Sequence, residues 1–526
     1  MRSNMKNFKE SNNITKVMIG ACIAAIIYLW GRDLLRMISY EIPNEIRQGA
    51  NVALTEAFAR GENPYRMMTN GNGEPMVFYM YPFLHSLIGA GIVKLTSLPA
   101  TLVLLGLNFL YITATAVLIS KITYCYTKEP YTVILAFLLS HYCGWRYTYV
   151  SAFPDMLAVM LMILIIYLCT VRKERINNKY LPVLSILTVL CFYSKQYAIV
   201  IGLPVAIWLW LYKGKKQSMY YIGWTALFGV VSASIIYMCM PLYFVETLLL
   251  VGNSADNSVW WSITQFIKIG KLFFPWFFMI LIWFWRDRRK KREVDFVWIH
   301  FFSMMILLIY FGQNQGAHLS YHLQLGLPAT IILAMRALNW LLNCERIKGE
   351  WLRNGIRLIA LVCAIYPAWW LKTPELTKDD LANWNHLYDI AENSAALLAT
   401  SQNTDEELLN GRYMYDCGQN QYILRKEALQ YWDMMEESAL VRKIFPEALE
   451  LKKVHEQYRE QVLNGLEAQR YDTLLLIENF GFTRDWDDFT ENRDQYYIMK
   501  EQIPIETGSW KWTVGVWERK ERVEGN

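Results

Sequence analysis

About eleven long apolar runs in the first 371 residues constrain this chain more than any other feature. A helix needs about 20 apolar residues to cross the hydrocarbon core of a bilayer, where only helices and closed barrels satisfy every backbone hydrogen bond. A hydrophobic content of 54% and an aromatic content of 15% agree with many crossings and with aromatic belts at both interfaces. We therefore predict a polytopic α-helical membrane protein with helices near residues 16–31, 100–122, 130–146, 155–171, 180–194, 196–212, 219–240, 264–285, 295–311, 323–343 and 355–371.

The last part of the chain has a different character. Residues 447–468 have the apolar spacing of a helix, and residues 472–478, 496–505 and 510–519 have the pattern of strands. Residues 372–526 carry 18 Lys and Arg against 30 Asp and Glu, whereas residues 1–371 carry 34 against 17. We expect a transmembrane catalytic domain (1–371) followed by an acidic soluble α+β domain (372–526), and neither charge balance indicates nucleic acid binding.

The orientation of the chain depends on residues 76–98, which are apolar enough to cross but contain Pro, His, Gly and Lys. Basic loops stay on the cytoplasmic side. If 76–98 crosses, the basic loops at 171–175, 212–216 and 286–292 fall outside; if it lies in the outer interface, all three fall inside. We therefore predict an interfacial helix, about 11 crossings, a cytoplasmic N-terminus and an extracytoplasmic tail, in a membrane expected to be a bacterial plasma membrane. Residues 31–98 then form the first outer loop.

The unusual polar residues of the membrane part gather on the predicted outer side, in loops at 31–98, 143–155, 193–197, 241–263 and 312–322. Such a gathering favours an enzyme that works at the membrane face. Two alternatives remain, a polytopic lipid or glycan transporter or flippase, and a non-catalytic envelope assembly protein. A transporter is expected to have internal repeats and charges at mid-membrane, and the sequence has no clear repeat.

Glu45 is the leading candidate for a general base in the first outer loop. A carboxylate there can accept the proton of an acceptor hydroxyl. The structural alternative is helix capping, with Asn44 as the cap and an acid in the first turn, and Glu41 and Asp33 compete for the same role. Arg47 can bind phosphate through its two-pronged guanidinium or meet lipid headgroups.

Asp155 and Lys195 stand at two other membrane boundaries. Pro154 and Asp155 are ordinary residues for a helix start, but an acid at this place can also bind sugar hydroxyls or a divalent metal. Lys195 and Gln196 interrupt an apolar stretch that is too long for one crossing. The lysine either pairs with a lipid phosphate or extends its ammonium into the interface.

The remaining candidates combine aromatic rings, amides and imidazoles. Tyr65 can stack on a sugar ring, and Tyr81 is either a binding residue or part of the aromatic belt. His318, Tyr321 and His322 follow a run of amides in a late outer loop. Two His four residues apart share a helix face, but no acidic third ligand is near in sequence, and phosphate or sugar binding fits this mixture better.

Several of these residues occur in motifs with a common order. They are Glu45 in NEIRQGA, the G-x-N-P-Y turn ending at Tyr65, the segment from Tyr79 to His85, Pro154-Asp155, Lys195-Gln196, and Tyr321-His322 before Pro328. Together they resemble the GT-C superfold of membrane glycosyltransferases that use polyprenyl-phosphate-linked sugars, as the dolichyl-phosphate-mannose mannosyltransferases do. That family often has Asp where this chain has Glu45, and Arg where it has Phe153.

The resemblance implies a transfer reaction and a set of partners. A polyprenyl-phosphate-sugar donor would enter from the membrane lipids, and the acceptor would be a glycan, a lipid or a protein. Lys195, His318 and His322 would hold the phosphate, and Asp155 would orient the sugar or the acceptor. Glu45 would deprotonate the acceptor hydroxyl, which attacks the anomeric carbon with inversion. Some branches of the family use a divalent metal such as Mg²⁺ or Mn²⁺ and others use none, so no cofactor is certain.

Overall fold

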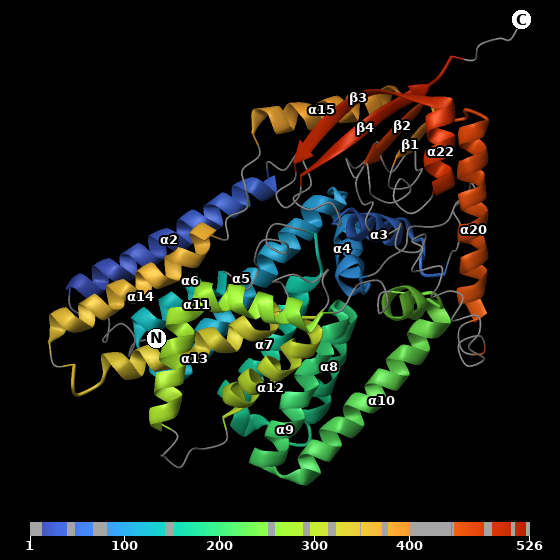
Figure 1. Ribbon diagram of the computed structural model, residues 1–526. Helices are drawn as coiled ribbons and strands as arrows, with labels where there is room; N and C mark the ends of the chain where they lie inside the picture. Colours follow the sequence, from blue (N-terminus) through green and yellow to red (C-terminus); the bar gives the residue numbers. More distant parts are fainter. Residues whose placement is uncertain are drawn as a thin grey trace, which may run out of the picture.

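A computed structural model describes most of the chain. The described residues are 13–38, 48–66, 81–141, 152–250, 258–287, 295–313, 322–347, 349–370, 377–399, 443, 446–477, 487–506 and 511–521. They form a helical bundle with a smaller sheet-containing domain at one end (Figure 1). This arrangement agrees with the predicted fold class of a helical membrane protein with a C-terminal α+β domain.

Eleven helices of the bundle coincide with the predicted apolar runs. They are α2 (Asn13–Ile38), α5 (Ala100–Thr127), α6 (Pro130–Ser140), α7 (Asp155–Val171), α8 (Leu181–Ser194), α9 (Gly202–Lys213), α10 (Lys215–Cys239), α11 (Val259–Asp287), α12 (Phe296–Phe311), α13 (Leu327–Leu342) and α14 (Glu350–Trp370). Within the described residues, six segments are long and apolar enough to cross a membrane by length and composition alone. The number of crossings and their direction stay predictions.

The positions of α7 and α10 explain how the bundle is built. Helix α7 is buried on nearly all sides because α5, α8 and α12 pack around it. Helix α10 contacts α8 and α9 and has only Ser218 and Tyr221 buried among its described residues. It extends along the edge of the bundle (Figure 1). Its many exposed apolar side chains are suited to lipid rather than to water.

Two helices of the first predicted outer loop lie side by side at the end of the bundle nearest the sheet (Figure 1). They are α3 (Gln48–Arg60) and α4 (Leu84–Thr96). A helix of 13 residues is about 20 Å long, which is short of the roughly 30 Å hydrocarbon core. Helices α6, with 11 residues, and α9, with 12, are shorter still although both coincide with predicted crossings, so the interfacial position of residues 76–98 stays a prediction. At Gly89 an added Cβ would lie 2.7 Å from Leu104 Cδ2, so glycine allows α4 to approach α5 closely.

The tail forms a four-stranded sheet with helices on both faces. Its elements are α15 (Lys378–Asn393), β1 (Leu397–Ala399), α20 (Pro446–Glu467), β2 (Thr473–Ile477), α22 (Asp487–Tyr496), β3 (Tyr497–Glu506) and β4 (Lys511–Arg519). The strand order is β1-β2-β4-β3, with β1 and β2 parallel and the other pairs antiparallel. Successive side chains of a strand point to opposite faces. Accordingly, Leu475 and Ile477 pack with α15, and Leu474 and Leu476 pack with α20 and α22.

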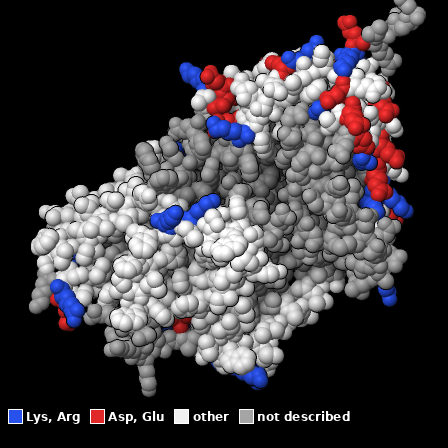
Figure 2. All heavy atoms as spheres, viewed as in Figure 1, with Lys and Arg blue, Asp and Glu red and all other residues white. Residues whose placement is uncertain are grey.

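The tail and the bundle differ in the number of charged side chains on their surfaces. In Figure 2 most charged side chains gather over the tail, whereas the helical part of the same face is largely uncharged. Helix α15 begins with a capping box, in which Thr377 and Asp380 each bond the other's backbone N–H. The hydrogen bonds from the Thr377 hydroxyl and backbone lower the pKa of Asp380. Such capping stabilises a helix at the surface of a soluble domain.

A partly buried ion pair connects four helices at the end of the bundle where α12 begins. Asp295 caps α12 by accepting a hydrogen bond from Val297 N at 3.0 Å, and it also accepts one from the Tyr126 hydroxyl at 2.9 Å. Its second oxygen pairs with Arg336 of α13. The guanidinium of Arg336 lies 3.9 Å from the centre of the Tyr126 ring and 5.0 Å from that of Trp283 in α11.

We expect Asp295→Ala to destabilise the bundle, because it leaves the Arg336 charge without its carboxylate. Breaking one side of a fully buried pair costs about 3–5 kcal/mol, and we expect a smaller loss here because both side chains are partly exposed; the lost helix cap adds about 1 kcal/mol. Thermal unfolding of the purified protein in detergent measures the effect. Asp295→Asn is the control, since it keeps a side-chain acceptor and should lower the midpoint less. Equal midpoints for Asp295→Ala and the wild type would contradict this role.

Candidate functional site

Three polar side chains from separate parts of the chain meet at one end of the bundle. Asp155 is the first residue of α7, Lys195 directly follows α8, and Gln324 lies in a short π-helix, η6 (His322–Gly326). Lys195 Nζ lies 3.1 Å from Asp155 Oδ2, and Gln324 Nε2 donates to Asp155 Oδ1 at 3.0 Å. Their exposed fractions are only 5%, 6% and 1%, in that order. We call these residues the polar triad.

The triad holds a carboxylate and an ammonium out of contact with water. Removing two charges from water is costly unless they pair and form further hydrogen bonds. Asp155 has a partner for each oxygen, and its position in the first turn of α7 places it in the favourable field of the helix N-terminus. A charged cluster inside a membrane bundle is by default a sign of function rather than of stability.

Tyr81 and Phe153 form the wall beside Lys195. The ammonium lies 3.9 Å from the centre of the Tyr81 ring, within the range of a cation–π interaction. The Phe153 ring meets the Tyr81 ring edge to face at 5.4 Å. Tyr65 donates from its hydroxyl to the Tyr81 carbonyl oxygen at 2.7 Å. Two tyrosines of the first predicted outer loop are thereby connected to the triad.

Tyr65 itself is fully buried in an aromatic cluster. Its ring lies edge to face with Tyr243 at 5.4 Å and near Phe58 at 6.3 Å. The Tyr65 carbonyl accepts a hydrogen bond from Leu242 N at 2.9 Å. In this conformation the ring is covered on its faces by protein. Tyr65 therefore joins the first loop to the segment after α10, and its predicted stacking on a sugar is not open to it here.

Irregular helices surround the triad. Gln196 opens a 3₁₀ segment, η3 (Gln196–Ile201), and its side-chain amide donates to the Thr247 carbonyl at 2.9 Å. Thr247 belongs to a second π-helix, η4 (Val245–Leu250), which also holds the buried Glu246. π-helices are rare and frequently occur at functional sites. Among the described residues, no group of three or more His, Cys, Asp and Glu is arranged to hold a metal ion.

The segment before Asp155 is fixed by a polar residue in the middle of α5. Asn108 is fully buried, and its Nδ2 donates to the Phe153 carbonyl at 2.8 Å. The next carbonyl, of Pro154, accepts from Ala158 N within α7. Sequence reasoning missed both Asn108 and Gln324. The available signal for Asn108 was an isolated amide in an apolar helix, which is costly in a membrane without a partner.

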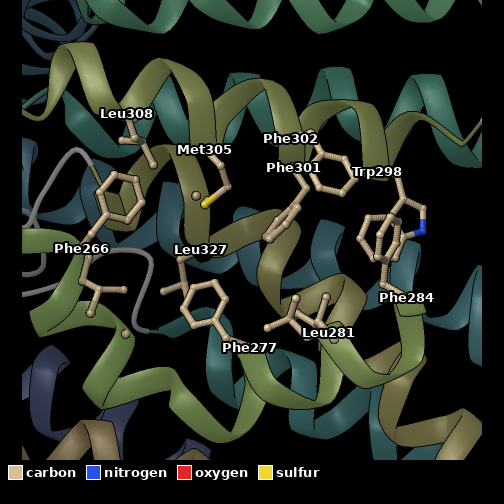
Figure 3. Close-up of a pocket in the computed structure, with 14 residues that line it drawn as sticks. Phe266, Phe277, Leu281, Phe284, Trp298, Phe301, Phe302, Met305, Leu308 and Leu327 are labelled. Atoms are coloured by element: carbon tan, nitrogen blue, oxygen red, sulfur yellow. The ribbon is translucent and has the colours of Figure 1, made fainter. Parts of the chain in front are cut away.

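A hydrophobic groove of about 380 Å³ lies between α11, α12 and the start of α13 (Figure 3). Helix α11 departs from helical geometry at Phe273, close to Pro275, so it bends along the groove. Aromatic rings, aliphatic side chains and a methionine line it. They are Phe266, Ile269, Gly270, Phe277, Ile280, Leu281, Phe284, Trp298, Phe301, Phe302, Met305, Leu308, Gly326 and Leu327. Gly326 and Leu327 come two and three residues after Gln324, so the groove begins close to the triad along the chain.

Comparison with known structures identifies the fold. ArnT from Cupriavidus metallidurans, in a crystal structure with bound undecaprenyl phosphate, matches with a TM-score of 0.53 at 12% identity over 97% of this chain and 98% of the other. Its apo structure gives a TM-score of 0.53 and 12% identity over 97% and 99%. The chain therefore has the GT-C fold. A comparison with protein-family models gave no match, and a comparison with curated proteins gave none.

The GT-C fold confirms the architecture that the sequence motifs implied. Five predicted residues come together at one end of the bundle, namely Asp155, Lys195, Gln196, Tyr65 and Tyr81. Glu45, Arg47, His318 and Tyr321 lie outside the described residues, and for His322 the backbone alone is described, as the first residue of η6. The functional roles of all ten residues stay predictions.

We expect Asn108→Leu to destabilise the protein by about 1–3 kcal/mol, because it removes the buried hydrogen bond from Asn108 to the Phe153 carbonyl. Thr115→Val is the matched control. Thr115 is fully buried on the same helix, and its hydroxyl oxygen has no hydrogen-bond partner within the described residues. Thermal unfolding in detergent should therefore show a clear loss for Asn108→Leu and little change for Thr115→Val. Equal losses would mean that the hydrogen bond to Phe153 contributes nothing special.

Proposed function

We propose that this protein is an integral membrane glycosyltransferase that moves a sugar from a polyprenyl-phosphate donor to an acceptor hydroxyl. One observation carries the proposal: in a chain with the GT-C fold, a buried lysine lies between a carboxylate and a tyrosine ring. The same carboxylate is bonded by Gln324 of η6, the short helix whose Gly326 lines a hydrophobic groove. A lipid-linked anion needs both a cation for its phosphate and an apolar place for its hydrocarbon. The undecaprenyl phosphate bound to ArnT supports a donor of this class.

Lys195 is the residue that we assign to the donor phosphate. Its ammonium has three donors, and Asp155 accepts one of them. A phosphate group bound beside it would be paired with this cation while Asp155 and Tyr81 hold the ammonium in place. As the bond to the sugar breaks, negative charge grows on the leaving phosphate, and a preorganised cation in a dry site stabilises that charge. His318, Tyr321, His322 and Arg47 are assigned to the same phosphate.

In the proposed reaction, Glu45 accepts the proton of the acceptor hydroxyl. The acceptor oxygen forms a bond to the anomeric carbon from the face opposite the phosphate, which inverts the configuration. The bond between that carbon and the phosphate oxygen breaks, and its electron pair leaves with the polyprenyl phosphate. Asp155 keeps both oxygens occupied by Lys195 and Gln324. We therefore give it an orienting role toward lysine and sugar rather than the role of base.

The proposed reaction takes place at the extracytoplasmic face, where the positive-inside rule puts the triad. The acceptor is a glycan, a lipid or a protein, and the sugar is a hexose such as mannose. A divalent ion, Mg²⁺ or Mn²⁺, remains compatible with this proposal. Transfer in vesicles that contain the purified protein, a labelled donor lipid and an acceptor tests the function. Movement of donor lipid across the bilayer without formation of product would support a flippase instead.

We expect Glu45→Gln to lower the transfer rate by at least about 100-fold, because the amide cannot accept the acceptor proton. The variant should insert into the membrane and unfold at the same temperature as the wild type. Glu62→Gln is the control, since Glu62 is an outer-loop carboxylate paired with Arg60 at 2.9 Å. Product formation is measured by mass spectrometry. Normal transfer by Glu45→Gln would remove Glu45 as the base.

Single and double variants of Asp155 and Lys195 distinguish a catalytic role of this pair from a role in folding. Lys195→Met alone leaves Asp155 buried without its cation and should cost about 3–5 kcal/mol. The double variant Asp155→Asn, Lys195→Met removes both charges and should regain most of that stability. Both variants should lose at least about 100-fold in kcat/KM, because the phosphate has lost its cation. A stable double variant with normal transfer would show that the pair serves folding alone.

A further inference from the structure

The short π-helix η6 belongs both to the polar triad and to the hydrophobic groove. Gln324 in its middle holds Asp155 at 3.0 Å. Gly326 at its end and Leu327 directly after it line the groove. A movement of η6 would therefore change the contact with Asp155 and the groove wall together. The same five residues also contact α7, α11, α12 and α13.

The backbone of η6 packs tightly against α12. A Cβ added at Gly326 would lie 2.8 Å from Met305 Cε and 3.3 Å from Leu308 Cδ1. Met305 and Leu308 also line the groove (Figure 3). Whatever fills the groove therefore touches the two side chains against which η6 rests. Methionine is flexible and adapts its shape to its neighbours, so Met305 can transmit the presence of an occupant to η6.

The groove is open toward the predicted lipid side of the bundle. Leu281 and Phe302 line it, and 63% and 45% of these residues are exposed. The described residues that line it include no charged side chain, so the groove favours a hydrocarbon over a polar ligand. Its volume of about 380 Å³ falls in the usual range for ligand sites of roughly 300–1,000 Å³. One end is formed by Gly326, two residues after Gln324, and Gln324 bonds the carboxylate that holds the proposed phosphate ligand Lys195.

We propose that the isoprenoid chain of the donor occupies this groove and that its contact with Met305 and Leu308 holds η6, and with it Gln324 and Asp155, in the arrangement needed for transfer. The inference rests on the proposed function. It adds that binding of the donor's isoprenoid chain affects the rate of sugar transfer. Binding energy from a remote part of a substrate raises kcat when it is used to order the reacting groups. The chain length of the donor thus acts on kcat as well as on KM.

Two donors with the same sugar phosphate test the coupling, one with a long polyprenyl chain and one with a short, water-soluble isoprenoid. At saturating concentrations we expect kcat to be at least about tenfold lower with the short chain, because a part of the binding energy is missing. Gln324→Leu should remove most of the difference, since η6 no longer reaches Asp155. Equal kcat values for the two donors in the wild type would overturn the coupling.

Gly270 offers a way to fill the groove from within. It lines the groove, and an added Cβ there meets nothing within 4 Å. Gly270→Leu and Gly270→Phe should progressively lower kcat and raise KM for the long-chain donor and leave the short-chain donor unchanged. Gly229→Phe is the matched control, because Gly229 on α10 also has open space and lies outside the groove. Equal effects of Gly229→Phe and Gly270→Phe would overturn the assignment of the groove.

Binding separates this inference from the proposed function. Native mass spectrometry with long-chain polyprenyl phosphate should detect the lipid on the wild type and on Gly229→Phe, but much less on Gly270→Phe. If the wild type transfers no sugar yet binds the lipid in this groove-dependent way, the proposed function fails and the groove assignment stands. If Gly270→Phe binds as much lipid as the wild type, the groove assignment fails, whatever the transfer assay gives. Preferential retention of ordinary phospholipid would also overturn it.

Discussion

The buried pair of Lys195 and Asp155 is the interaction on which the site depends. It joins the end of α8 to the start of α7, and Gln324 adds η6 to the same carboxylate. A hydrophobic pair of similar size would hold these helices together at lower cost in desolvation. The two charges are therefore better explained by a functional role than by a contribution to the stability of the fold. In the proposed function, the task of this lysine is to stabilise the negative charge on the leaving phosphate.

The apolar runs predicted the places of the bundle helices because lipid demands long, fully hydrogen-bonded segments. Boundaries were less accurate: α2 extends to Ile38, since Leu34 and Leu35 continue the apolar pattern beyond the charged Arg32 and Asp33. In the tail the sequence predicted α20 and three strands but missed β1, α15 and α22. A strand of three residues that pairs with β2 across a long insertion has no local pattern to reveal it.

The site residues that could be predicted from the sequence are polar residues that stand at the end of an apolar run. Asp155 and Lys195 each interrupt an apolar region at its edge, which made both visible in the sequence. Their pairing, and the part of Gln324 in it, depends on contacts between residues far apart in the chain, which no local pattern contains. Tyr65 shows the opposite case. The sequence analysis predicted that its ring can stack on a sugar, yet in the structure the ring packs against Tyr243 and is completely buried.

The irregular helices explain how a membrane bundle can hold such a site. Regular α-helices satisfy their own backbone and leave only side chains for contacts between helices. Around the triad, η3, η4 and η6 replace regular turns, and the Thr247 carbonyl of η4 bonds the side chain of Gln196. Backbone groups near the triad are thus available as partners for polar side chains. Within η6, Gln324 bonds Asp155 and Gly326 lines the groove, so in the proposed function one short segment contacts both the charged part and the hydrocarbon part of the donor lipid.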